Sequence, residues 1–365
     1  MNKPLLTITG LNAQPVNVPI TRPLITAGGS ITHAPLILID LMTDGGVTGR
    51  SYLFVYAPMA LLPITELLKS MGEMIKGQSL IPKDVFDFMQ KKFTLLGLQG
   101  FSMMAVSGVD MACWDAAARA DNLPLCQYLG HKPVPIPAYN STGLGLIGAD
   151  AAATEALELV DAGFTAIKLR LGYQDGKTDA EVCKAVRDAV GPDIHIMADY
   201  NQSLSVKEAL SRVHNLEHSG LYWIEEPVAF DNYVGCAQIR KASHIPIQIG
   251  ENCWGPNDML KAIEAKSCSF FMPDAMKIGG VTGWLKAAKL AEQTMLPLSS
   301  HLFPEISAHL LTISSTRHWL EYIDFAKPIL KHPLKVAKNG TVTPSSRAGI
   351  GLEWDPHSVD QFLYT

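Results

Sequence analysis

Residues 161–173 read DAGFTAIKLRLGY, an apolar run that carries two cations, Lys168 and Arg170, near its end. The run predicts a buried strand, and because side chains alternate across a strand, Lys168 and Arg170 share one face. Burying two neighbouring positive charges costs several kcal/mol unless an anionic group meets them. This strand is therefore expected to face an anionic site.

Similar runs before and after this strand set the architecture from residue 133 to residue 323. They read VPIPAYNS before it and DIHIMADY, GLYWIEEP, PIQIGEN, CSFFMPD, LPLSSH and HWLEY after it. A helical segment separates most neighbours. Alternating strands and helices predict a parallel sheet, and eight such units predict a closed α/β barrel. An open doubly wound sheet is the alternative architecture.

The chain on either side of the barrel strands has a different pattern. Residues 1–132 are expected to form an α+β domain, in which 33–56 read as two strands around a Thr-Asp-Gly-Gly turn. Segment 21–33, with its Gly28-Gly29 pair, is expected to be a mobile lid loop over the substrate. Residues 324–365 are loop-rich and are expected to pack back on the first domain. Helical patterns are found around 58–77, 83–93 and 102–120.

Composition narrows the class of protein. The 365 residues are 47% hydrophobic and 18% charged, which is typical of a packed globular protein, and a net charge of −5 argues against a nucleic-acid partner. Six scattered cysteines without a C-x-x-C pair indicate buried thiols in a reducing compartment. The first residues lack the apolar core of a signal peptide, and no uncharged apolar run is long enough to span a membrane. A cytoplasmic protein without membrane contacts is expected.

Carboxylates close three consecutive strands of the expected barrel. Asp199, Glu225 and Glu251 are separated by 26 residues each, a plausible length for one β/α unit. Strand ends of such a barrel meet at one mouth, where three carboxylates need a counter-ion. Three oxygen donors suit Mg²⁺, with Mn²⁺ nearly as suitable, and zinc is disfavoured because no Cys or His is among them. Asn201, on the strand face of Asp199, is expected to support the metal ligands from behind or to lie near the substrate, with a loop cap as the alternative.

The last three strands end in further polar side chains, Asp274, His301 and Glu321. Taken singly, an acid at a strand end is more often a helix cap or an ion-pair partner, and a lone histidine is more often structural. Taken together with the three preceding acids, they predict one functional cluster at the barrel mouth.

Long, ordered and correctly spaced stretches resemble a known family. They are HAPLILIDL, GRSYLFVYAP, ADYNQSL, WIEEP, GENCWGP, MPDAMKIGGVTGW, SSHLFPEISAHLL and HWLE. The chain is similar to the mandelate racemase group of the enolase superfamily over nearly its whole length. The resemblance implies an α+β capping domain over a modified TIM barrel, (β/α)7β, that holds Mg²⁺.

The same resemblance implies a role for each residue of the cluster. Removing a proton next to a carboxylate creates a dianion, which Mg²⁺, Lys168 and a neutral, hydrogen-bond-donating Glu321 would stabilise. Asp274 would orient His301 as the base. The substrate would be a carboxylate with an α-proton, typically a 2-hydroxy acid. Metal ligands would be Asp199, Glu225 and Glu251; Ser141 and Tyr56 match pocket positions; the lid and wall would comprise Leu24, Ile31, Leu98 and Ile323.

Arg170 departs from the family pattern, which has a second catalytic lysine at this position. A neutral arginine at pH 7 costs roughly 9 kcal/mol, because its pKa is near ~13.8. A guanidinium is better suited to binding a pair of oxygens. The first prediction is a racemase-like enzyme in which proton transfer on the Arg170 side of the substrate is slow. The apolar lid residues favour it. An acid-sugar dehydratase that uses only Asp274 and His301 is the alternative.

Two further alternatives stay open. In the lactonizing branch of the superfamily the base is a lysine after the sixth strand, which would be Lys277, but the intact Asp274–His301 pair argues against it. A non-catalytic relative that binds a metal and a small carboxylate is the other. A symmetric homo-oligomer is expected from the apolar composition and the resemblance.

Overall fold

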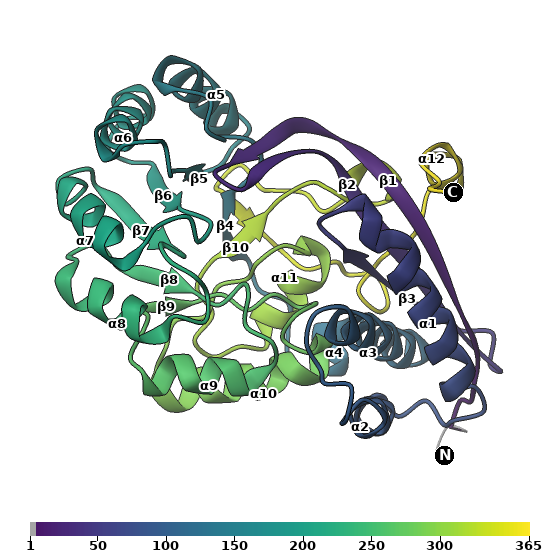
Figure 1. The fold of residues 1–365 in the computed structure, drawn as a ribbon. Coiled ribbons are helices and arrows are strands. Elements are labelled where there is room, and N and C mark those ends of the chain that lie inside the picture. Colours follow the sequence, from purple (N-terminus) through teal and green to yellow (C-terminus); the bar gives the residue numbers. More distant parts are fainter. Residues whose placement is uncertain (1–4) are drawn as a thin grey trace.

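The computed structural model describes residues 5–365, so the first four residues of the expected N-terminal domain lie outside it. An antiparallel sheet with helices at the N-terminal end adjoins a curled parallel sheet surrounded by helices (Figure 1). None of the helices in the described part of the chain is long and apolar enough to cross a membrane. The architecture is that of a modified TIM barrel with an N-terminal cap, as predicted.

The N-terminal sheet has the strand order β1-β2-β3, with β1 (Ile8–Thr26), β2 (Gly29–Thr43) and β3 (Thr48–Phe54). The predicted turn between β2 and β3 is present. Segment 21–33, predicted as a loop, is instead the end of the long β1–β2 hairpin, where Leu24 pairs with Ile31. The sequence concealed these strands because their alternation is irregular, whereas the turn needs only Gly29, at φ 134°, to reverse the chain.

Helices fill the space between this sheet and the barrel. The central helix α3 is buried from Ser102 to Ala118, because small residues let its neighbours approach on every side. At Gly49 of β3, for example, a Cβ would lie 2.1 Å from the backbone oxygen of Ala112. The helices of this part are η1 (Pro58–Ala60), α1 (Leu61–Ile75), α2 (Pro82–Lys92), α3 (Phe101–Ala120) and α4 (Leu125–Tyr128).

The barrel strands are parallel and follow the order β10-β4-β5-β6-β7-β8-β9. Each is short, and helices connect successive strands on the outside (Figure 1). The strands are β4 (Ile136–Asn140), β5 (Ala166–Arg170), β6 (His195–Asp199), β7 (Leu221–Glu225), β8 (Ile247–Ile249), β9 (Phe270–Phe271) and β10 (Leu320–Tyr322). The helices are α5 (Ala149–Asp161), α6 (Gly176–Val190), α7 (Val206–Asn215), α8 (Tyr233–Ala242), α9 (Pro256–Glu264), α10 (Gly280–Thr294) and α11 (Pro304–Thr312).

The seventh predicted strand, 296–301, makes only isolated bridges. Leu298 bridges Phe271 of β9 on one side and Arg317, before β10, on the other. Backbone hydrogen bonds join it to both sides, such as Ser299 N–H to Phe271 O at 2.8 Å and Leu298 N–H to Thr316 O at 2.9 Å. The segment still links β9 to β10, so it completes the circle of strands and brings His301 to the same mouth as the other strand ends.

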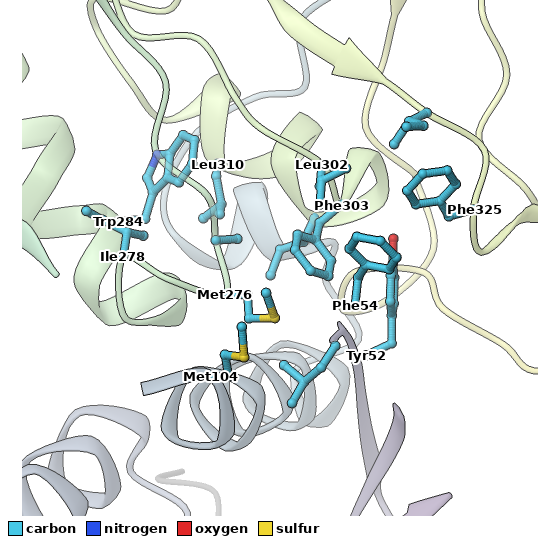
Figure 2. Close-up of a cluster of buried hydrophobic side chains, with 14 of the residues drawn as sticks. Tyr52, Phe54, Met104, Met276, Ile278, Trp284, Leu302, Phe303, Leu310 and Phe325 are labelled. Carbon is cyan, nitrogen blue, oxygen red and sulfur yellow. The ribbon is translucent and has the colours of Figure 1, made fainter. Parts of the chain in front are cut away.

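A shared apolar core joins the N-terminal part to the barrel. Figure 2 shows Tyr52 and Phe54 of β3 and Met104 of α3 packed towards Met276 and Phe303 of the barrel. Tyr52 Oη also donates a hydrogen bond of 2.7 Å to Glu305 of α11. The contact continues where Trp114 of α3 donates to Thr282 of α10 at 2.9 Å. This core fixes the N-terminal part beside the barrel mouth.

The C-terminal segment contacts both parts. It contains η2 (Lys327–Ile329), β11 (Thr341–Val342), which pairs with β4, and α12 (Pro356–Gln361). Trp354 Nε1 donates to Asp40 of β2 at 3.0 Å, and Asn17 N–H donates to Phe362 O at 2.9 Å. The segment therefore lies across the N-terminal sheet after it leaves the barrel.

Candidate active site

Three carboxylates converge at the mouth of the barrel. Asp199 and Glu225 are the last residues of β6 and β7, and Glu251 follows β8 by two residues. One carboxylate oxygen from each lies within 4.8 Å of the others, and all three side chains are buried. Negative charges this close repel one another unless a cation joins them. The structure thus brings together the three residues that the sequence predicted as metal ligands.

Lys168 projects from β5 into this acidic cluster. Its Nζ lies 2.6 Å from Glu225 Oε1, 3.2 Å from Asp199 Oδ2 and 2.8 Å from Glu321 Oε1. The side chain is only 1% exposed. Burial lowers the pKa of Lys168, but the surrounding carboxylates, Glu225 foremost, outweigh burial and raise that pKa well above its usual value. The ammonium stays charged, and these acids are the anionic site that the β5 sequence required.

His301 and Asp274 form a hydrogen-bonded pair beside the cluster. Asp274 Oδ2 lies 2.7 Å from His301 Nδ1, and the other Asp274 oxygen accepts the backbone N–H of Met276 at 2.7 Å. His301 Nε2 lies 3.1 Å from Glu251 Oε2. Burial lowers the pKa of His301, but Glu251, Glu321 and then Asp274 raise it, and the net effect is a raised pKa. The pair therefore points one imidazole nitrogen at the acids and fixes the other.

Glu321 of β10 is held through both of its carboxylate oxygens. One carboxylate oxygen accepts the backbone N–H of Leu302 at 2.7 Å, and the other faces Lys168. Burial raises the pKa of Glu321, but the charges of Lys168 and His301 outweigh burial and hold that pKa well below its usual range. Glu321 is thus a carboxylate acceptor in this structure. The role of Glu321 as a neutral donor towards a bound substrate stays a prediction.

Arg170, also on β5, is held by the loop that follows β4. Nη1 donates to the backbone oxygens of Ser141 and Gly143, each at 2.8 Å, and Nη2 donates to Ser141 Oγ at 2.8 Å. The side chain is 3% exposed, and within the described residues its Nε has no hydrogen-bond partner. The guanidinium is therefore immobilised through its N–H groups and keeps one buried donor free.

Two of the residues predicted to line the substrate pocket, Ser141 and Asn201, form hydrogen bonds to neighbouring side chains. The buried Ser141 offers both its oxygens to Arg170. Asn201 donates its backbone N–H and its Nδ2 to Asp199 at 2.8 and 3.0 Å, so it orients a candidate metal ligand. The predicted role of Asn201 in supporting the metal ligands agrees with these bonds, and so does the alternative of a loop cap.

Tyr56, after β3, faces the cluster from the N-terminal part. Burial raises its pKa well above the usual value, and the charges of Asp274 and Glu251 raise it further. Its Oη is buried without a hydrogen-bond partner in the described chain. The predicted pocket residue Ile31 lies on the hairpin, opposite Leu24.

The end of the β1–β2 hairpin, residues 21–29, rests on the loop after β4. Leu146 N–H donates to Ile25 O at 2.9 Å, and a Cβ at Gly145 would lie only 2.7 Å from that oxygen, so glycine permits the approach. Arg22 forms ion pairs with Glu155 at 3.2 Å and Glu158 at 2.6 Å on α5. The hairpin thereby reaches the rim of the barrel near Arg170 (Figure 1).

Sequence reasoning missed residues that contact the acids directly. Trp223 Nε1 donates to Glu225 Oε2 at 3.1 Å, and Asn252 Nδ2 donates to Glu251 Oε1 at 2.8 Å. A signal for both was present, since Trp223 shares the strand face of Glu225 and Asn252 directly follows Glu251. Glu226 is also buried, and burial together with the Glu251 charge raises its pKa to about 8.

The donor set fits a hard divalent cation. Asp199, Glu225 and Glu251 offer only oxygen atoms, from three separate elements, and leave other coordination positions open, which favours Mg²⁺. Lys168 is the cation in contact with two of them, so the buried charge of the three acids is not balanced by it alone. These three residues would therefore hold Mg²⁺.

Comparison with known proteins agrees with this site. Residues 151–358 match the family model of enolase C-terminal domain-like proteins, and residues 8–130 match the mandelate racemase / muconate lactonizing enzyme N-terminal domain. A solved enolase from Bradyrhizobium, complexed with magnesium and mandelic acid, is 45% identical and covers 100% of both chains with a TM-score of 0.95. Another, from alphaproteobacterium BAL199 with bound Mg, is 44% identical, covers 98% of this chain and 100% of its own, and has a TM-score of 0.96.

A curated enzyme is also similar. The L-talarate/galactarate dehydratase of Salmonella typhimurium is 27% identical over 346 residues, which are 93% of this chain and 85% of that enzyme. The two family models together span nearly the whole chain. The chain belongs to the enolase superfamily, as a Mg²⁺-dependent enzyme of the mandelate racemase type.

Proposed function

We propose that this enzyme removes the α-proton of a 2-hydroxy carboxylate, with His301 as its single base. The observation that carries the proposal is the Asp274–His301 pair beside the acid cluster. In the neutral imidazole, Asp274 would accept a hydrogen bond from Nδ1–H, which leaves the Nε2 lone pair available for the substrate. Mg²⁺, when bound, would offset the second negative charge that develops on the substrate carboxylate. Lys168, already in the cluster, would stabilise the same charge.

Arg170 supports chemistry with one base. Accepting a proton would require a neutral guanidine, whereas its Nη1 and Nη2 groups are committed as donors to Ser141 and Gly143. His301 would then both take the α-proton and return it to the β-hydroxyl group, which leaves as water. The resulting enol becomes a 2-keto-3-deoxy acid. The free Nε–H of Arg170 suits an oxygen that such a substrate carries beyond C2. Dehydration of a sugar acid is therefore the favoured outcome.

Racemisation of a 2-hydroxy acid is the second candidate. It is favoured by the mandelic acid held in the Bradyrhizobium relative and by the apolar pair Leu24 and Ile31 on the hairpin. Racemisation needs proton transfer on both faces of the substrate, so it would be slow with Arg170 on one of them. A small 2-hydroxy or sugar acid is the substrate class in either case.

The experiment is a screen of single-enantiomer 2-hydroxy acids and sugar acids with Mg²⁺, in which 2-keto acid and chirality are both measured. Dehydration predicts 2-keto acid from at least one sugar acid, lost in EDTA and in the His301→Asn variant. Racemisation predicts the opposite enantiomer without keto acid. If no acid in the panel forms product or loses its α-proton, the chain is a non-catalytic binder and the proposal is wrong.

We also propose a cytoplasmic location and a symmetric homo-oligomer. The six cysteines of the chain are free and buried, which supports a reducing compartment. Met59, Leu95 and Leu96 are strongly exposed apolar side chains in the N-terminal part, which supports a subunit contact there. Light scattering of the purified enzyme tests the assembly, because a monomer would contradict it.

A further inference from the structure

Lys277 is a buried cation that the proposed reaction does not use. It follows Asp274 on the loop before α10 and is 3% exposed. Its Nζ donates to Asn252 Oδ1 at 2.6 Å and lies over the rings of Tyr56, at 4.5 Å, and Trp254, at 5.9 Å. Among the described residues, no carboxylate forms an ion pair with it. Burying an ammonium group without a paired carboxylate costs free energy, so a compensating role for Lys277 is expected.

The Lys277 contact determines which way the Asn252 amide faces. An ammonium can only donate, so the amide oxygen must point at Lys277 and the NH₂ group must point away from it. Both hydrogens of that group are then used, because Nδ2 donates to Glu251 Oε1 at 2.8 Å and to Glu226 Oε2 at 2.7 Å. Rotating the amide by half a turn would place its oxygen against two acids.

Glu251 needs such support more than the other two candidate ligands. Asp199 and Glu225 end regular strands and have their own donors, Asn201 and Trp223. Glu251 lies two residues beyond β8, after Gly250 at φ 130°, where the sheet no longer fixes the backbone. With Oε1 held by Asn252, its Oε2 is turned to His301 and the cluster.

We propose that Lys277 and Asn252 are a positioning pair for the metal ligand Glu251. Lys277 sets the orientation of the Asn252 amide, and the amide holds one oxygen of Glu251 so that the other stays in the cluster. The inference rests on the metal site of the proposed function and adds residues that act through the ligand without touching the ion. Donors behind metal ligands typically change metal affinity by about 10–100-fold when they are removed.

The experiment is calorimetric titration of Mg²⁺ into the full-length enzyme and a double-mutant cycle of Asn252→Leu and Lys277→Met. Lys277→Met keeps the side-chain volume, Asn252→Leu keeps the branched shape but is larger, and both remove the polar group. Asn252→Leu is expected to raise the Kd for Mg²⁺ by about 10–100-fold. Lys277→Met is expected to raise the Kd in the native background but not in the Asn252→Leu background, where no amide remains to orient. Lys261→Met removes an exposed lysine on α9 and is the matched control.

Each outcome decides the matter. If Asn252→Leu leaves the Kd within threefold, or if Lys277→Met has the same effect in both backgrounds, the positioning pair is wrong while the metal site stands. If the native enzyme itself does not bind Mg²⁺ at millimolar concentration, the metal site and the pair both fail. Circular dichroism checks folding, and Asn252→Ser replaces the leucine variant in the same cycle if that variant is unfolded.

Discussion

At the scale of single residues, Arg170 and His301 differ in which of their nitrogen atoms are held by hydrogen bonds. Arg170 is tied by three hydrogen bonds to the loop after β4, all given through its Nη groups. His301 is held by Asp274 at Nδ1, and its Nε2 faces Glu251 and the rest of the acid cluster. Proton transfer in the proposed reaction therefore takes place at His301.

Replacing Arg170 with lysine should open a second path for protons. A lysine cannot span the Ser141 and Gly143 oxygens in the same way, and burial beside other cations lowers a lysine pKa into a useful range. We expect Arg170→Lys to raise the rate of enantiomer inversion of a 2-hydroxy acid at least about tenfold, which polarimetry measures. Arg170→Met is the control and should give no gain. An unchanged rate in the lysine variant would contradict this account of the site.

Thermal melting of the Glu225→Gln variant tests the metal site without a substrate. A ligand that binds only the folded protein raises its stability with concentration, by about 2.7 kcal/mol at one hundred times Kd. We expect 10 mM Mg²⁺ (about ten to one hundred times a sub-millimolar Kd) to raise the melting temperature of the native enzyme. In Glu225→Gln the shift should largely disappear, although the metal-free variant melts no lower, because one of several crowded acids is gone. An equal shift in both proteins would place the ion elsewhere.

At the scale of elements, the β1–β2 hairpin is fastened to the barrel by a few contacts at its end. Arg22, partly exposed, holds Glu155 and Glu158 of α5, and exposed pairs contribute about 0.2–1 kcal/mol each. We expect Arg22→Gln to speed amide hydrogen exchange in residues 21–29 up to about fivefold, more at low salt than at high salt. Lys184→Gln, which breaks an exposed pair within α6, is the control and should leave the hairpin unchanged. Unaltered exchange in the Arg22 variant would show that backbone contacts alone hold the hairpin.

The contribution of the α3–α10 contact to the free energy of unfolding depends on pH. Burial raises the pKa of Asp110 to about 7, despite hydrogen bonds from the Thr282 hydroxyl and N–H. Because the folded state binds this proton more tightly than the unfolded state, the contribution of Asp110 to stability is complete below pH 3.8 and is lost as the pH rises towards 7.

The Asp110→Asn variant measures this loss. We expect the free energy of unfolding of the native enzyme to fall relative to Asp110→Asn by about 3 kcal/mol between pH 5 and pH 8. Urea unfolding at both pH values gives the difference. His309 and His318, whose burial lowers their pKa to about 4, are present in both proteins, so their opposite pH trend cancels. Parallel pH profiles for the two proteins would rule out a buried, titrating Asp110.

At the scale of the whole molecule, the sequence predicted the fold and the members of the acid cluster. The reason is regularity: strand ends of a parallel barrel share one mouth, so acids that recur at strand ends must meet there. The contact of Lys168 with Glu225 follows from the same rule, because the lysine shares the inward face of its strand.

What the sequence did not predict depends on irregular chain. The partners of Arg170 lie on a loop about one β/α unit earlier, and nothing local determines its path. The Asn252 amide is oriented by Lys277, which is distant in sequence. The segment 296–301 forms isolated bridges in place of a regular strand, and the hairpin end has too irregular an alternation to be recognised as strand. Such features arise from tertiary contacts and carry no periodic signal.

The most direct measurement follows the α-proton of single-enantiomer 2-hydroxy and sugar acids by proton NMR in D₂O, with the native enzyme and the His301→Asn variant. With Mg²⁺ and the native enzyme, we predict that at least one acid loses its α-proton signal without inversion of configuration, by exchange or by elimination. EDTA and the His301→Asn variant should each abolish the loss. Persistent α-protons across the panel, or loss that continues in the His301→Asn variant, would contradict a site in which His301 is the single base.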